Sequence, residues 1–115
     1  MKRVLVVEDD AETRALLEVV LSQAGYEVKA AANGLDGYRE ARGFHPDLVV
    51  TDLMMPIMDG VELCAVLRSQ SDIPVVLITA YEPPKHRAIW DAYFNKPLEI
   101  PELLDSVKRL TGPAN

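Results

Sequence analysis

The sequence has one cysteine, few aromatic residues and no long hydrophobic run. The single Cys64 excludes an intramolecular disulfide, and its place in a helical pattern predicts a small buried hydrophobic residue. After Met1, Lys2 and Arg3, only four aliphatic residues precede the first acidic one, which is too few for a signal-peptide core or a membrane span. We therefore expect a cytoplasmic protein.

Positive charge is also scarce. The sequence has 12 Lys and Arg residues and 18 Asp and Glu residues, which gives a net charge of −6. This charge argues against a nucleic-acid-binding surface and suits the binding of cations or basic partners. With 49% hydrophobic and 26% charged residues, the composition is that of a globular protein. A chain of 115 residues can bury roughly two thirds of its unfolded surface in one core, so we expect a single domain over residues 1–115.

The apolar residues alternate between extended and helical patterns. The extended runs cover residues 3–7, 27–31, 48–51, 75–78 and 92–95, and the helical patterns cover 11–24, 35–42, 61–68 and 98–110. In the first helix we expect an inward face of Leu16, Leu17, Val20 and Leu21, with Gly25 just beyond the helix end. This order predicts an α/β fold with a doubly wound, five-stranded parallel sheet.

Four of the extended runs end in a carboxylate, a hydroxyl or an amine. They end at Glu8-Asp9-Asp10, at Asp52, at Thr79 and at Lys96. Parallel strands place these ends on one edge of the sheet, where open α/β folds bind ligands. We therefore expect the four groups to form one site.

The carboxylates of this group indicate a metal. Neighbouring carboxylates raise one another's pKa, and a divalent cation removes that penalty. Asp52 adds a ligand from a second strand, which gives an all-oxygen site suited to Mg²⁺. The alternative for the acidic triplet is to cap the first helix, and Asp10 is well placed for that.

Asp52 has the features of a nucleophile toward a phosphoryl group. A strand-end carboxylate beside Mg²⁺ can form an aspartyl phosphate. Asp52 is poorly placed to cap a helix, because the next helical pattern begins only near Gly60 and Asp59 is the better cap. The alternative is a solvated carboxylate with no chemical role.

Lys96 and Thr79 supply the remaining polar groups. An ammonium can pair with Asp52 and later with phosphoryl oxygens, and a cis Lys96–Pro97 bond would fix the direction of the lysine. The Thr79 hydroxyl can donate to a phosphoryl oxygen. Taken singly, a lysine is usually a solvated surface residue, and the alternative for Thr79 is a strand-end threonine chosen for β propensity.

Together these residues resemble the receiver domain of bacterial two-component response regulators. The matching segments are residues 4–10, 52–60, 79–80 and 93–97, in this order along the chain. The resemblance implies a flavodoxin-like (βα)5 fold and Mg²⁺ as the cofactor. It also implies that Glu8, Asp9, Asp52 and the Met54 carbonyl bind the metal and that Asp52 is the phosphoacceptor. Thr79, Ala80 and Lys96 would contact the phosphoryl group and take part in the switch, in which the Tyr93 ring turns inward.

The family's activity is that of a switch. A sensor histidine kinase or a phosphotransfer protein donates the phosphoryl group, and the domain catalyses only its own phosphorylation and dephosphorylation before it meets an effector. One alternative is a pseudo-receiver that binds a partner constitutively. A second is an aspartyl-phosphate phosphatase, but its motif needs two aspartates one residue apart, and here Asp9-Asp10 is followed by Ala11.

The chain departs from the family between Thr79 and Lys96. This segment is shorter than usual and has Trp90-Asp91 where the family has Gly-Ala, so we expect a short or irregular fourth helix starting near Pro84. That helix belongs to the face through which receivers dimerise, so the usual dimer contacts would change. Trp90 would fill the vacated volume or anchor a partner.

Further expectations concern four residues. We expect His45 and His86 to be surface residues, because no second His or Cys lies at metal-binding spacing. A bulky Tyr81, together with Met54, would flank the phosphoryl group and slow its hydrolysis.

Overall fold

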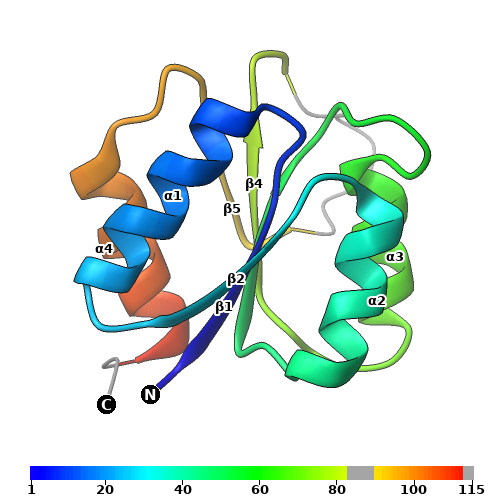
Figure 1. Cartoon of the computed structure of the whole chain (residues 1–115), viewed down its shortest axis with the longest axis horizontal. Coiled ribbons are helices and arrows are strands. Elements are labelled where there is room, and N and C mark those ends of the chain that lie inside the picture. The colour runs from blue at the N-terminus through cyan, green and yellow to red at the C-terminus, as the bar shows by residue number, and fades with distance from the viewer. Residues whose placement is uncertain (83–89, 113–115) are drawn as a thin grey trace.

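The computed structural model describes residues 1–82 and 90–112, which form a five-stranded parallel sheet between two layers of helices (Figure 1). Its strand order is β2-β1-β3-β4-β5. The strands are β1 (Arg3–Val7), β2 (Glu27–Ala31), β3 (Leu48–Asp52), β4 (Val75–Thr79) and β5 (Ala92–Asn95). The helices are α1 (Ala11–Gln23), α2 (Gly34–Phe44), α3 (Gly60–Arg68) and α4 (Ile100–Thr111). The predicted doubly wound fold is confirmed, and each predicted strand is found.

The central strands are buried on both faces because helices cover both. Alternate side chains of a strand point to opposite faces. On one face, Val4 and Val6 of β1 pack with Leu17 of α1 and Leu103 of α4. On the other, the intervening Leu5 and Val7 pack with residues of α2 and α3: Ala41, Phe44, Leu63 and Leu67. This arrangement explains why these strands read as unbroken apolar runs.

The helix starts follow local sequence signals. The Asp10 carboxylate accepts a 2.9 Å hydrogen bond from the Thr13 amide and caps α1, as predicted for Asp10. Asp59 caps α3, also as predicted, in a reciprocal pair with Glu62. Gly25 follows α1 with a φ of 101°, the left-handed backbone that favours glycine there.

One predicted core residue is wrong. Leu16 was expected inward with Leu17, Val20 and Leu21, but its side chain is 46% exposed. Leu17 and Leu21 are fully buried, and Val20 only partly. Consecutive helical residues point about 100° apart, so the contact of α1 with the sheet is too narrow to include Leu16 as well.

Several other expectations concern single residues. Cys64 is buried in α3, as predicted. His45 is exposed, as predicted, and ends α2 in a left-handed conformation with a φ of 53°. Trp90 is half-buried. The fourth helix expected near Pro84 lies outside the described residues, and so does His86.

The helices of the described segments are too short or too polar to cross a lipid bilayer.

Candidate phosphoacceptor site

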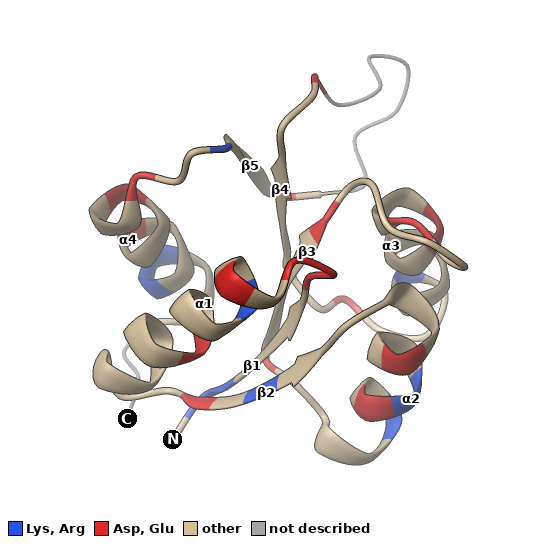
Figure 2. Ribbon diagram, turned by 45° about the horizontal axis from the view of Figure 1, so that its top comes forward, with Lys and Arg blue, Asp and Glu red and all other residues tan. Residues whose placement is uncertain are grey.

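The sheet register brings the predicted site residues to one edge. At this edge, Val7 of β1 pairs with Thr51 of β3. Asp52 of β3 pairs with Ile78 of β4, and Thr79 of β4 pairs with Asn95 of β5. The polar residues that end these strands therefore lie in neighbouring positions. Acidic segments after β1 and at the end of β3 meet at this edge in Figure 2.

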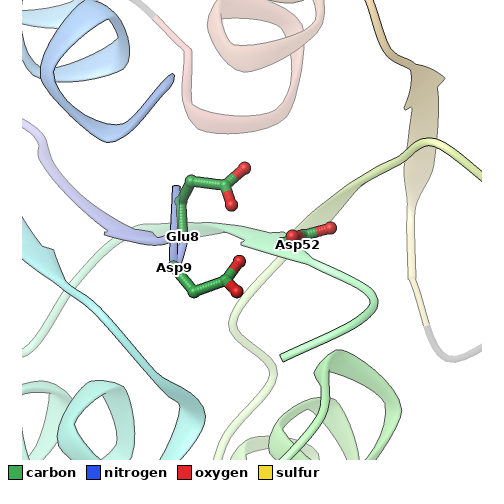
Figure 3. A group of neighbouring side chains, drawn as sticks. All are labelled: Glu8, Asp9 and Asp52. Atoms are coloured by element: carbon green, nitrogen blue, oxygen red, sulfur yellow. The ribbon is translucent and has the colours of Figure 1, made fainter. Parts of the chain in front are cut away.

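Three carboxylates converge there. Glu8, Asp9 and Asp52 each offer an oxygen, and these oxygens all lie within 4.8 Å of one another (Figure 3). Glu8 is fully buried and Asp52 is 6% exposed, whereas Asp9 is exposed. Negative charges that are this close together and largely shielded from water repel one another strongly unless a cation or a proton compensates them.

Lys96 provides a cation at the same point. Its Nζ lies 2.6 Å from Glu8 Oε1 and 3.3 Å from Asp52 Oδ2. The Lys96–Pro97 peptide bond is cis. Burial alone would lower the pKa of Lys96, but the hydrogen bond that Lys96 donates to Glu8 and the charge of Asp52 outweigh it and raise the pKa above its ordinary value. Lys96 is therefore firmly charged.

Glu8 is short of favourable contacts in spite of this lysine. Burial raises its pKa to about 7, although Lys96 and the Asp10 amide act in the opposite direction. Apart from the Lys96 ammonium 2.6 Å away, Glu8 Oε1 has no hydrogen-bond partner among the described residues. A buried carboxylate oxygen with spare capacity, next to two more carboxylates, is the donor set that Mg²⁺ binds. The residues present thus fit this ion.

Asp10 does not join the cluster. Its carboxylate accepts hydrogen bonds from both the amide and the hydroxyl of Thr13, and these bonds lower its pKa. The capping interpretation of the acidic triplet is therefore confirmed for Asp10, whereas Glu8 and Asp9 face Asp52.

Thr79 is buried at the end of β4, and two backbone amides donate hydrogen bonds to it. Its carbonyl accepts a 2.8 Å hydrogen bond from the Lys96 amide, and its hydroxyl oxygen accepts one of 2.9 Å from the Tyr81 amide. Ala80, between them, is exposed. Within residues 1–82 and 90–112, no acceptor is found for the hydroxyl proton of Thr79.

Three large side chains that lie close to the strand ends in the sequence are exposed. Met54 is 58% exposed, Tyr81 63% and Tyr93 48%. Met54 lies in the loop that joins β3 to α3, residues 53–59, which we call the β3–α3 loop. Tyr93 lies on β5 and has an outward, solvent-exposed ring in this structure.

Sequence reasoning missed one supporting residue. Arg14 of α1 donates a 2.8 Å hydrogen bond to the carbonyl of Glu8, and so ties the helix to the residue that begins the acidic cluster. Its position one turn into a capped helix was the available signal, because an arginine there can reach back to the preceding strand end.

A surface cavity of about 410 Å³ lies elsewhere, between α2 and α3. Tyr38, Arg42, Leu67 and Ile73 are among its lining residues, and none of the predicted site residues lines it. This cavity is therefore separate from the site at the strand ends.

Comparison with known proteins identifies the class of this fold and site. Residues 4–108 match the family model described as the response regulator receiver domain, so the chain belongs to that family. It is a signalling domain.

Particular relatives are similar over nearly the whole chain. A probable transcriptional regulator, ycf27, of Cyanophora paradoxa is 40% identical over 95% of this chain and 48% of its own length. The DNA-binding response regulator MtrA of Mycolicibacterium paratuberculosis is 35% identical over 93% of this chain and 50% of its own. The chain thus spans about half the length of these curated relatives.

Solved structures agree with the family. The response regulator TrrA of Thermotoga maritima, in complex with Mg²⁺-BeF, is 34% identical, with a TM-score of 0.87 over 96% of this chain and 99% of its own. The chemotaxis protein CheY4 of Vibrio cholerae is 29% identical, with a TM-score of 0.88 over 96% of this chain and 98% of its own.

Proposed function

We propose that Asp52 accepts a phosphoryl group and that residues 1–115 act as one phosphoacceptor domain. The observation that carries this proposal is the shared position of Asp52, which lies within 4.8 Å of the oxygens of Glu8 and Asp9 and 3.3 Å from the Lys96 ammonium. A nucleophilic carboxylate thus has metal-binding oxygens beside it and a fixed cation in contact.

Mg²⁺ would be held by Glu8, Asp9, Asp52 and the carbonyl of Met54. When bound, it supplies positive charge against the oxygens of the incoming phosphoryl group. The fit rests on the chemistry of the donors, which are all oxygens, and on the spare capacity of the buried Glu8 Oε1. Loading the site would also compensate the burial of Glu8 and the nearby charge of Asp52, which raise the pKa of Glu8.

In the reaction, an oxygen of Asp52 attacks phosphorus and forms the acyl phosphate. The bond between phosphorus and the donor breaks, and the donor leaves with its electron pair. Lys96 keeps its charge because its pKa is raised, so it can move from Asp52 to the phosphoryl oxygens without giving up a proton. Hydrolysis by water regenerates Asp52, and both steps are the domain's own chemistry.

The switch would run through Thr79 and Tyr93. The Thr79 hydroxyl is free to donate its proton to a phosphoryl oxygen, with the Ala80 amide as a neighbouring contact. The Tyr93 ring is 48% exposed and would turn inward into space that Thr79 gives up. New charge and new hydrogen bonds would thus bias two arrangements of this edge.

The partner that donates the phosphoryl group would be a sensor histidine kinase or a phosphotransfer protein, acting in the cytoplasm. Receiver domains of this family interact with kinases and effector domains. Since the curated relatives are about twice as long and include DNA-binding regulators, we propose an effector domain as the downstream partner. The acidic receiver itself, with a net charge of −6, would not bind nucleic acid directly.

Intact mass after incubation with a small acyl-phosphate donor tests the proposal. We expect a Mg²⁺-dependent gain of one phosphoryl group by the wild type and no gain by Asp52→Asn. Asp59→Asn is a matched control, because Asp59 caps α3 outside the carboxylate cluster, and it should still gain the group. A folded wild type that gains nothing would contradict the proposal and favour a constitutive binding module.

A further inference from the structure

The start of α2 makes unusually close contact with the β3–α3 loop. Gly34 is the first residue of α2 and is buried. A Cβ atom at this position would lie 2.2 Å from the carbonyl oxygen of Met58 and 2.8 Å from its Cβ. The obstructing atoms belong to the backbone and to Cβ, so no side-chain rotation can remove the clash.

The loop that receives this contact is closed at its base. The Gly60 amide donates to the Leu53 carbonyl at 2.8 Å, and the Leu53 amide donates to the Ile78 carbonyl at 3.0 Å. These bonds fix the two ends of the loop against β4. They leave its outer part, which includes Met54 and Met58, to be placed by other contacts.

The outer part carries backbone strain. The Met58 amide donates a 2.9 Å hydrogen bond to the Pro56 carbonyl, and Ile57 between them has a φ of 75°. This is a γ-turn of the rare kind, and a β-branched residue with such a φ is an outlier. Such a conformation persists only where its surroundings hold it in place. Gly34 lies against the residue that follows Ile57.

The other glycines of α2 do not have this relationship. A Cβ at Gly43 would meet nothing within 4 Å, and one at Gly37 would meet the side chain of Val7 in β1. Of these three positions, Gly34 alone faces the loop. The helix therefore carries its own matched control for a test.

We propose that Gly34 is a positioning residue for the metal site. By letting α2 approach the Met58 backbone, it holds the β3–α3 loop so that the carbonyl of Met54 reaches the metal. This inference rests on the proposed function, in which that carbonyl is a ligand. Residues that orient metal ligands from outside commonly change metal affinity 10- to 100-fold when they are mutated.

The test compares Gly34→Ala with Gly43→Ala. Mg²⁺ affinity is measured by calorimetry for the wild type and both variants, under conditions where urea denaturation shows each to be fully folded. We expect Gly34→Ala to bind Mg²⁺ about tenfold more weakly. We also expect its amide chemical shifts to change mainly over residues 53–59. Gly43→Ala should bind Mg²⁺ with wild-type affinity, because its methyl group enters open space.

The outcomes separate this inference from the proposed function. If the wild type and Gly34→Ala bind Mg²⁺ equally, the positioning role is wrong and the phosphoacceptor site stands. If the wild type binds no Mg²⁺, both fail. Should Gly34→Ala not fold, Met58→Gly loosens the same contact from the loop side without a clash. Wild-type affinity in that variant would overturn the inference.

Discussion

The backbone amide of Lys96 donates a 2.8 Å hydrogen bond to the carbonyl of Thr79. The residue that follows β5 is thereby held at the end of β4. The lysine side chain then reaches past β4 to Glu8, 2.6 Å away, and to Asp52, 3.3 Å away. One residue thus contacts Thr79, Asp52 and Glu8, which come from three different strand ends.

Removing the charge of Lys96 should unbalance the carboxylates. Lys96→Met leaves Glu8 and Asp52 without their cation, and we expect a loss of about 1–3 kcal/mol in the free energy of unfolding when Mg²⁺ is absent. The loss should be larger well above pH 7 than well below it, because Glu8, with a pKa of about 7, can take up a proton in acid. Urea denaturation at both pH values measures it.

The control for that experiment is Lys96→Arg, which keeps the charge. It should retain more of the stability, while phosphorylation still falls because a planar guanidinium cannot take the position of the ammonium. Equal stability of Lys96→Met and the wild type above pH 7 would contradict the role given to the ion pair.

Glu8 should make both stability and metal binding depend on pH. Its pKa is about 7 in the folded chain, against an ordinary value of 4.5. Between these values the unfolded chain has lost the proton and the folded chain still holds it, so stability falls as pH rises through this window. We expect a fall on the order of 1–3 kcal/mol without Mg²⁺. The apparent Mg²⁺ affinity should weaken below pH 7, as protons compete for Glu8.

Glu8→Gln should remove most of this pH dependence, whereas Glu12→Gln, on the exposed start of α1, should preserve it. The measurement is urea denaturation and Mg²⁺ calorimetry across the window. A stability profile of the wild type that rises between these pH values would count against a raised pKa.

Tyr81 should prolong the phosphorylated state. Its ring is 63% exposed beside the edge, and its amide is fixed by the Thr79 hydroxyl oxygen at 2.9 Å. Tyr81→Ala should speed hydrolysis of the acyl phosphate several-fold, because water gains access, and Tyr81→Phe should not. Decay of the phosphorylated mass after removal of donor gives the rate. An unchanged rate in Tyr81→Ala would show that its bulk does not shield the group.

Cys64 should be chemically silent in the folded domain. The thiol is buried in α3, and burial raises its pKa to about 12, so almost none of it is the reactive thiolate near neutral pH. We expect thiol reagents to label it only after denaturation, as followed by mass. Rapid labelling of the native protein would mean that α3 opens far more readily than its packing indicates.

The predictions of the strands and of the helix caps had different origins in the sequence. Runs such as 4–7 and 75–78 are apolar without alternation, and the placement of polar residues just after them indicates parallel strands buried on both faces. Asp10 and Asp59 were recognisable as caps because their side chains bond to amides only two or three residues away. Such signals can be recognised from the sequence because all the residues that form them lie within a few positions of one another.

Packing decided the features that the sequence left open. Leu16 belongs to the same apolar pattern as Leu17, yet only the contact with the sheet determines which of the two is buried. The support that Arg14 gives to the Glu8 carbonyl depends on the angle at which α1 leaves β1. Nothing near Gly34 in the sequence identifies Met58 as its neighbour, because the two residues lie 24 positions apart. They come together only where the start of α2 packs against the β3–α3 loop.

By itself, the sequence determined which elements form and which polar residues end the strands, since periodicity, capping and strand-end chemistry are local properties. Only the tertiary structure decided that Glu8, Asp9 and Asp52 lie within 4.8 Å of one another and that Glu8 is buried enough to hold a proton near pH 7. Distances between strands and the removal of water depend on how the sheet and helices pack, and no segment of the chain contains that information alone.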